Sequence, residues 1–230
     1  MMLKKRRKQN KRRSLIVREN PRSPVSEQFR TIRTNIQYAS VDQDMQAIMT
    51  TSSGPEEGKT TVNANLAETI AQQNEKVLLI DADMRKPTMQ YMFYLANHTG
   101  ITNVMTGQRD LQDVIETTGN EALDVVTCGP IPPNPSELLG SQKMKDIIQE
   151  ARTLYDYIVI DTPPVLAVTD AQIVAGMSDG VLLVVASGET EKEEARKATD
   201  LLKQTNAKML GAVLNRQERK NSNYMYYYGD

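Results

Sequence analysis

The segment 48–62 constrains the fold most, because an apolar stretch there runs into a loop with two glycines and then into a helical pattern. The loop has the G-x-x-x-x-G-K-S/T pattern of a phosphate-binding loop, with Ser53 in place of the first glycine. Successive backbone N–H groups and the helix N-terminus can still bind phosphate oxygens, so the physical basis of such a site is intact. A polar strand-to-helix turn is the alternative interpretation.

The pattern assigns a role to each part of the loop. Gly58 lets the backbone approach the phosphates, Lys59 reaches the β- and γ-phosphates, and the Thr60 hydroxyl binds Mg²⁺. ATP and Mg²⁺ are therefore the expected cofactors. The predicted nucleotide-binding residues are Ser53, Gly54, Pro55, Glu56, Glu57, Gly58, Lys59, Thr60 and Thr61.

The composition is that of a globular chain with about one domain: 230 residues, of which 39% are hydrophobic and 25% charged. The single cysteine, Cys128, excludes a disulfide framework and fits a reducing cytoplasm. The single histidine, His98, has no cysteine partners for a zinc site and is expected at the surface. No stretch approaches the roughly 20 apolar residues that a membrane-spanning helix needs.

Basic residues are concentrated at the start of the chain. Eight of the 28 lysines and arginines lie in residues 1–13, which contain no acidic residue, and the other 20 are accompanied by 29 acidic residues. A basic arm on an acidic body is not typical of a nucleic-acid-binding domain, so nucleic acid is not an expected partner. Residues 1–22 are predicted to form a flexible arm, which either touches anionic lipid or is simply solvated.

Apolar stretches of strand length alternate with helical patterns along the rest of the chain. Uniformly apolar stretches are typical of strands buried on both faces of a parallel sheet. The predicted fold is therefore α/β, with a mainly parallel central β-sheet flanked by helices. Strands are predicted at 45–51, 77–80, 123–127, 157–161, 181–186 and 209–214, and helices at 25–38, 60–73, 89–94, 111–116, 136–139, 142–154 and after a capping box at 190–193.

Acidic residues follow two of the predicted strands. Asp81 and Asp83 follow the strand at 77–80, and Asp161 ends the strand at 157–161. Because the carboxyl ends of parallel strands share one edge, these side chains should meet the phosphate-binding loop. An extended chain would place Asp81 and Asp83 on one face, where one could bind a metal-bound water and the other accept a proton from a hydroxyl. Ordinary loop caps are the alternative. The candidate Mg²⁺ ligands are Thr60, Asp83 and Asp161, and the candidate catalytic residues are Lys59, Asp81, Asp83 and Asp161.

Two further groups of residues suggest contacts between molecules. Along one side of the helix predicted at 25–38, Glu27, Arg30 and Arg33 recur every three residues. They form either a solvated charged face or a contact between subunits. Four of the nine tyrosines lie near the end of the chain, where they either pack on a partner or accept phosphate. These tyrosines are Tyr224, Tyr226, Tyr227 and Tyr228.

Together these motifs resemble those of the bacterial tyrosine kinases (BY-kinases) of capsule and exopolysaccharide synthesis. The resemblance extends from about Ser23 to the end of the chain. The segments that carry it are 53–60 (Walker A), 78–83 (Walker A′), 158–161 (Walker B), 129–135 (proline-rich loop), Glu27, Arg30 and Arg33 (oligomerisation motif) and the four tail tyrosines (autophosphorylation cluster).

The resemblance implies the P-loop fold of the MinD and ParA ATPases and an ATP-dependent protein-tyrosine kinase. The kinase would phosphorylate a neighbour's tail within a homo-oligomeric ring, with Asp81 as a base. A transmembrane adaptor, other protein tyrosine substrates, a phosphotyrosine phosphatase and a cytoplasmic location at the inner face of the plasma membrane are also implied. Glu56 and Glu57 depart from the family pattern, and they would weaken ATP binding unless both side chains point outward.

The predicted domain organisation is a basic arm (residues 1–22), a P-loop kinase domain (23–220) and a tyrosine-rich tail (221–230). Two other functions fit parts of the sequence. A positioning ATPase of the MinD/ParA kind would explain the basic arm, but neither the tyrosine tail nor the charged helix face. A regulatory module that holds nucleotide without catalysis is disfavoured by the intact set of Lys59, Thr60, Asp81 and Asp161.

Overall fold

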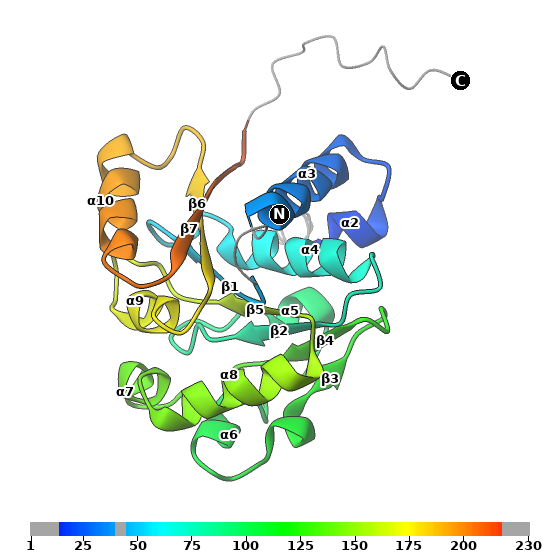
Figure 1. Ribbon diagram of the computed structural model, residues 1–230, viewed down its shortest axis with the longest axis vertical. Coiled ribbons are helices and arrows are strands. Elements are labelled where there is room, and N and C mark those ends of the chain that lie inside the picture. Colours follow the sequence, from blue (N-terminus) through cyan, green and yellow to red (C-terminus); the bar gives the residue numbers. More distant parts are fainter. Residues whose placement is uncertain (1–13, 40–44, 218–230) are drawn as a thin grey trace, which may run out of the picture.

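The computed structural model describes residues 14–39 and 45–217, and its centre is a seven-stranded sheet with the order β3-β4-β2-β5-β1-β6-β7. Every neighbouring pair is parallel except β3 and β4. The predicted α/β fold with a mainly parallel sheet is therefore confirmed (Figure 1). The strands are β1 (Ala47–Ser52), β2 (Val77–Asp81), β3 (Glu116–Thr117), β4 (Leu123–Val126), β5 (Tyr157–Asp161), β6 (Gly180–Ala186) and β7 (Lys208–Asn215).

Successive residues of the central strands alternate between two hydrophobic cores, one on each face of the sheet. In β1, Ile48 belongs to one core and Met49 to the other, and both are fully buried. In β2, Leu79 and Ile80 divide in the same way. Burial on both faces explains why these strands are apolar without alternation in the sequence.

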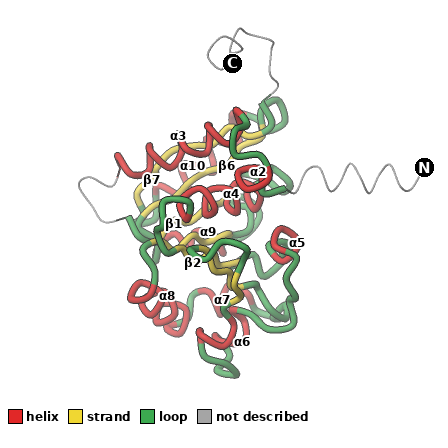
Figure 2. Tube along the Cα trace, turned by 90° about the vertical axis from the view of Figure 1, so that its right-hand side faces the viewer, coloured by secondary structure: helices red, strands yellow, loops and turns green. Residues whose placement is uncertain are grey.

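Helices cover both faces of the sheet (Figure 2). The core that contains Ile48 includes residues of α2, α3, α4 and α5, and the core that contains Met49 includes residues of α6 to α10. No helix within residues 14–39 and 45–217 is long and apolar enough to cross a membrane. The helices are α2 (Ile16–Glu19), α3 (Pro24–Ala39), α4 (Lys59–Ala71), α5 (Gln90–Phe93), α6 (Ile101–Met105), the 3-10 helix η1 (Leu111–Val114), α7 (Pro135–Leu139), α8 (Gln142–Leu154), α9 (Asp170–Ala175) and α10 (Lys192–Lys203).

Most predicted elements are present, and the differences concern short ones. The helices α6 and α9, of 5 and 6 residues, are absent from the prediction because so few residues show little periodicity. The helix predicted at 111–116 is instead the 3-10 helix η1 followed by β3. The short helices connect strands, and β3 adds an antiparallel strand at one edge of the sheet.

The capping box predicted at 190–193 does not form. Helix α10 begins at Lys192, and its N-cap residue Glu191 makes no side-chain capping hydrogen bond. The Thr190 hydroxyl instead accepts the N–H of Ala186 at 2.9 Å and donates to Glu57 of the phosphate-binding loop at 2.6 Å. A tertiary contact with another loop thus replaces the local cap.

The segment 14–22 differs from the flexible arm predicted for it, because it contains α2 and packs against α4. Val17 is fully buried, and its N–H is donated to Asn65 Oδ1 at 3.2 Å. Asn65 Nδ2 in turn donates to the carbonyl of Ser14 at 3.0 Å. The packed body therefore begins before residue 23, and the remainder of the predicted arm, residues 1–13, lies outside the described residues.

Asp179 joins elements at the amino ends of the strands. It lies just before β6, and its Oδ2 accepts the N–H groups of Gln46 at 3.0 Å and Ala47 at 2.8 Å. Arg152, in the last turn of α8, donates to both carboxylate oxygens at 2.9 and 2.8 Å. Burial alone would raise the pKa of Asp179, but hydrogen bonds from Arg152 and the backbone lower it below its usual value.

We predict that Asp179→Asn lowers the free energy of unfolding by about 2 kcal/mol at neutral pH, because Arg152 and two backbone N–H groups lose a charged acceptor. A carboxylate with a lowered pKa in the folded state stabilises the fold above its unfolded pKa of about 3.9. That contribution is lost as the pH falls below this value. Urea unfolding should therefore show a difference between the two proteins that is full at neutral pH and shrinks below about pH 4.

Glu150→Gln on the exposed side of α8 serves as the control for this experiment and should match the wild type at both pH values. A stability difference between Asp179→Asn and the wild type that does not change with pH would show that the charge of Asp179 is not involved.

Candidate active site

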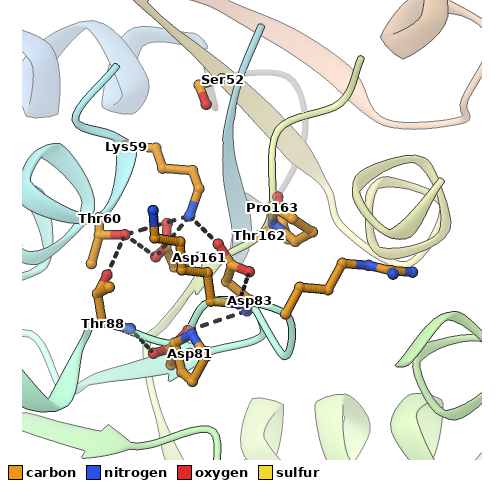
Figure 3. Close-up of polar contacts among 12 residues, drawn as sticks. Ser52, Lys59, Thr60, Asp81, Asp83, Thr88, Asp161, Thr162 and Pro163 are labelled. Carbon is orange, nitrogen blue, oxygen red and sulfur yellow. Dashed lines mark hydrogen bonds and ion pairs between the residues drawn. The ribbon is translucent and has the colours of Figure 1, made fainter. Parts of the chain in front are cut away.

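The phosphate-binding loop and the acidic residues lie at one edge of the sheet, because β2, β5 and β1 are neighbours and run parallel. In the strand register, Asp161 lies beside Asp81 on one side and beside Thr50 on the other. Figure 3 shows the side chains of Lys59, Asp83 and Asp161 directed toward one another. The three segments that carry the predicted site residues therefore meet in space.

The loop follows directly on β1 and leads into α4, whose first residue is Lys59. Gly58 has a φ of +92°, which favours glycine, and a Cβ there would lie 2.2 Å from Asn215 Nδ2. Ser52 Oγ donates to the carbonyl of Gly54 at 2.7 Å and tightens the start of the loop. Within the loop Ser53, Glu57 and Lys59 are buried, Gly54, Gly58, Thr60 and Thr61 are half-buried, and Pro55 and Glu56 are exposed.

Only one of the two glutamates in the loop points outward. The side chain of Glu56 is 79% exposed and contacts Lys86 at 3.5 Å. Glu57 is buried, and its carboxylate accepts the N–H of Ser53 at 2.9 Å and the hydroxyl of Thr190 at 2.6 Å. Both side chains are expected to point outward if ATP binding is not to be weakened, and only that of Glu56 does so.

Lys59 is the cation at the centre of the buried acidic residues (Figure 3). Its Nζ lies 2.7 Å from Asp83 Oδ2 and 3.5 Å from Asp161 Oδ2. The Thr60 hydroxyl donates to Asp161 Oδ2 at 2.5 Å. Burial alone would lower the pKa of Lys59, but Asp161 and Asp83 raise it above its usual value, so the ammonium stays charged. Burial raises the pKa of Asp161, although Lys59 and Thr60 oppose the shift.

Asp81 is placed differently from Asp83. It is fully buried, and its carboxylate accepts the N–H groups of Asp83 at 3.1 Å, Thr88 at 3.2 Å and Met89 at 3.0 Å. Strand β2 ends at Asp81 and the chain turns there, so the extended arrangement expected for the two carboxylates is wrong. Burial, reinforced by Asp161, raises the pKa of Asp81 to about 7. Asp81 thus holds the following loop in shape, whereas Asp83 contacts the lysine.

Sequence reasoning misses one group of residues beside the site. Arg85 Nε and Nη2 donate to the buried carboxylate of Asp170 at 2.8 and 3.0 Å, and Ser136 Oγ donates to it at 2.6 Å. Burial would raise the pKa of Asp170, but the hydrogen bonds from Arg85 and Ser136 lower it. The contact joins the loop after Asp83 to α7 and α9. The sequence gives one indication of this contact, which is the position of Arg85 two residues after Asp83. It gives none for Asp170, because the helix α9 that carries this residue is not predicted.

One buried carboxylate oxygen has no partner within the part of the chain that the structure describes. This atom is Asp161 Oδ1, and the Thr60 hydroxyl lies beside the other oxygen of the same carboxylate. Mg²⁺ commonly takes one or two protein oxygens and completes its shell with water and phosphates, so Thr60 and Asp161 fit such an ion. The described residues hold no group of three or more His, Cys, Asp or Glu side chains arranged around a metal position.

The other predicted functional residues are not part of this cluster. On α3, Glu27 and Arg30 form an ion pair with each other, and Arg33 Nη1 donates to the carbonyl of Thr69 on α4 at 3.2 Å. The predicted phosphoacceptors Tyr224, Tyr226, Tyr227 and Tyr228 lie outside the described residues.

A phosphate-binding loop between a parallel strand and its helix, with acidic residues at the ends of two neighbouring strands, defines a P-loop nucleotide-binding protein. A family model described as an AAA domain matches residues 45–209. The septum site-determining protein MinD of Pyrococcus horikoshii, solved in complex with Mg-ADP, has a TM-score of 0.66 and 25% identity, and the match covers 76% of this chain and 72% of that chain.

A narrower family follows from three other comparisons. The tyrosine-protein kinase YwqD of Bacillus subtilis is 49% identical over 228 residues, which are 99% of this chain and 96% of that protein. The kinase domain of the Escherichia coli tyrosine kinase ETK has a TM-score of 0.86 at 35% identity, covering 94% of this chain and 84% of that chain. The chimerical protein CapA2B2 has a TM-score of 0.86 at 46% identity, covering 89% of this chain and 90% of that chain. The chain therefore belongs to the bacterial tyrosine kinases.

We predict that the contact between Arg85 and Asp170 stabilises the loop that carries Asp83. Arg85→Ala should lower the free energy of unfolding by about 2 kcal/mol, because it leaves the buried carboxylate of Asp170 without its cation. Asp170→Ala should cost less, because the side chain of Arg85 is 41% exposed and water can solvate it. The losses should overlap in the double variant, with a coupling energy of about 1 kcal/mol or more. Urea unfolding of the four proteins measures this cycle.

Lys86→Ala is the matched control, since it removes only a surface ion pair with Glu56 and should change stability by less than about 0.5 kcal/mol. Losses that simply add in the Arg85/Asp170 double variant would show that the two residues act independently.

Proposed function

We propose that this kinase uses Mg·ATP to phosphorylate the tyrosines of its C-terminal cluster on a neighbouring subunit. The observation that carries the proposal is the meeting of Lys59, Asp83 and Asp161 beside a phosphate-binding loop. Phosphoryl transfer depends on positioning and charge stabilisation more than on covalent chemistry by the protein, and this edge of the sheet offers both. The proposed acceptors are Tyr224, Tyr226, Tyr227 and Tyr228.

The loop and the first turn of α4 are the proposed phosphate cradle. Backbone N–H groups there and the N-terminal end of the helix favour an anion, and Gly58 allows close approach of the backbone. Thr60 and Asp161 are the proposed Mg²⁺ ligands, because the Thr60 hydroxyl bonds Asp161 Oδ2 while Oδ1 of the same buried carboxylate has no partner among the described residues. A bound Mg²⁺ would supply positive charge against the β- and γ-phosphates.

Lys59 is proposed to exchange partners when nucleotide binds. Its Nζ pairs with Asp83 at 2.7 Å, and the surrounding acidic residues keep it charged. Phosphate oxygens compete for the same ammonium, so their arrival would free the carboxylate of Asp83. Asp83 is then available to bind Mg²⁺ directly or through water, which is the role that the sequence suggests for it.

Asp81 is the proposed acceptor of the tyrosine proton, a role that comes from the family motif it matches. In this structure its carboxylate also accepts three backbone N–H groups and is fully buried. Asp81 would therefore have to keep the loop after β2 in place and release part of this bonding when a phenol approaches. Loss of Asp81 should consequently affect both the loop and the reaction.

The proposed process is capsule or exopolysaccharide synthesis and export, regulated with a transmembrane adaptor, a phosphotyrosine phosphatase and other protein tyrosine substrates. A homo-oligomeric ring would bring one subunit's tail to its neighbour's site. The side chains of Glu27 and Arg30 are 54% and 31% exposed, so a neighbouring subunit can reach them, and Arg33 completes the proposed contact. The proposed location is the cytoplasmic face of the plasma membrane, through the adaptor.

We predict that incubation with Mg·ATP adds phosphate to the tail tyrosines, and that Lys59→Met abolishes this because the phosphates lose a charged contact. Asp81→Asn should abolish it as well. Mass spectrometry of the C-terminal peptide measures the modification. Lys76→Met is the control: it removes an exposed lysine at the amino end of β2 and should leave the rate at the wild-type level.

Tail phosphorylation at the wild-type rate by Lys59→Met protein would refute the assigned site. Release of free phosphate without modified tyrosine would instead indicate a positioning ATPase of the MinD/ParA kind.

We further predict that phosphorylation of the tail loosens the ring. Each phosphotyrosine adds about −1.5 to −2 charges, and several of them would lie beside the acidic residues at the strand ends. Like charges should expel the tail from the neighbour's site, so phosphorylated protein should have a lower mass in solution than a variant with the four tyrosines changed to phenylalanine. Light scattering measures both masses, and equal masses would contradict the switch.

A further inference from the structure

Glu57 is a buried acidic residue within the phosphate-binding loop, and both of its carboxylate oxygens have partners. Oε2 accepts the N–H of Ser53 at 2.9 Å, which closes the loop on itself. Oε1 accepts the hydroxyl of Thr190 at 2.6 Å, from the loop between β6 and α10. Among the described residues, no lysine or arginine forms an ion pair with Glu57. Its charge is therefore met by two hydrogen-bond donors.

The Thr190 hydroxyl is oriented by a second hydrogen bond. It accepts the N–H of Ala186, the last residue of β6, at 2.9 Å, which leaves its proton for Glu57. Strand β6 lies inside the sheet between β1 and β7. Thr190 thus links the phosphate-binding loop to a rigid part of the fold through one carboxylate.

The main chain of the same loop is held by the end of β7. Asn215 Nδ2 donates to the carbonyl of Glu57 at 2.8 Å, and its side chain occupies the space that a Cβ of Gly58 would need. Arg216, which pairs with Glu189, donates to the carbonyl of Glu56. The loop between β6 and α10 therefore holds the side chain of Glu57, and the end of β7 holds the backbone of the phosphate-binding loop.

We propose that Glu57 is a positioning residue of the kinase reaction, which fixes the shape of the phosphate-binding loop by accepting the N–H of Ser53 and the hydroxyl of Thr190. This inference rests on the proposed nucleotide site. A carboxylate suits the task because both partners donate, and an ionised carboxylate only accepts. The same bonds explain how an acidic residue fits within a phosphate cradle, since both of its oxygens are already engaged.

Loss of this clamp, defined as the contacts of Glu57 with Ser53 and Thr190, should act on nucleotide binding more than on the chemical step. A loop with more conformational freedom must be ordered when the phosphates bind, and this entropy cost weakens affinity. The loop would contact the phosphates of ATP both before and during transfer. A more mobile loop therefore weakens binding of the ground state and of the transition state by the same amount. Such a change raises KM for ATP and leaves kcat nearly unchanged.

The test compares Thr190→Val, which keeps the shape of the side chain but removes the hydroxyl, with Thr190→Ser, which keeps the bond. We expect Thr190→Val to raise KM for ATP and Kd for a fluorescent ADP by about tenfold, with kcat for tail phosphorylation within about threefold of wild type. Thr190→Ser should stay within about twofold. Glu57→Gln should behave like Thr190→Val, because an amide offers one acceptor atom where two are needed.

Hydrogen exchange of the Ser53 amide provides a direct readout of the clamp. Its N–H is buried and bonded to Glu57, so exchange should be about tenfold faster in Glu57→Gln. Glu150→Gln, a remote exposed glutamate on α8, is the control and should match the wild type in KM, Kd and exchange. Thermal melting verifies that each variant is folded. If Thr190→Val does not fold, the KM, Kd and exchange of Glu57→Gln test the proposal.

Wild-type KM and Kd in folded Thr190→Val and Glu57→Gln proteins would overturn the proposal. So would equal losses in Thr190→Ser and Thr190→Val. Lys59→Met in the same assays separates the two levels of inference. If Lys59→Met loses activity while the clamp variants match the wild type, the nucleotide site stands and the clamp fails. If Lys59→Met matches the wild type, the proposed site and the clamp built on it both fail.

Discussion

The structure depends on the pairing of one lysine with carboxylates that the sheet buries at its carboxyl edge. Asp83 and Asp161 share the ammonium of Lys59, and Asp81 lies beside them with no exposed surface. A buried charge without a partner costs several kcal/mol, so these side chains must be assembled together. The lysine that balances these acidic residues holds this edge of the sheet together, and under the proposed function the same charge meets the phosphates.

Around this centre, further buried carboxylates hold the loops that carry the functional residues. Asp170 accepts hydrogen bonds from Arg85 and Ser136, and Glu57 accepts them from Ser53 and Thr190. In each case one acceptor joins segments that are far apart in the sequence. Fully satisfied polar networks of this kind give irregular loops a single conformation. A kinase that works mainly by positioning its reactants needs such rigidity more than it needs additional reactive groups.

Local sequence patterns predict the wrong geometry where a tertiary hydrogen-bond partner competes with a local one. Residues 190–193 have the composition of a capping box, yet Thr190 bonds to Glu57 and leaves the helix uncapped by a side chain. Asp81 and Asp83 have the spacing of one strand face, yet the N–H of Asp83 turns back to the carboxylate of Asp81. Local and distant partners compete for the same donor, and burial favours the geometry that leaves fewest polar groups unpaired.

The sequence by itself determined the parallel sheet, the phosphate-binding loop and the meeting of that loop with the acidic strand ends. These features follow from apolar runs and from glycine-lysine-threonine spacing, which are local patterns with fixed consequences in a parallel topology. Only the tertiary structure decided that Asp83 faces Lys59 while Asp81 binds backbone, and that Glu57 turns inward. Those contacts depend on partners that are distant in the sequence: Lys59 and Asp161 are 102 residues apart, and Glu57 and Thr190 are 133 residues apart. Such partners bond to each other once burial has removed water as an alternative partner.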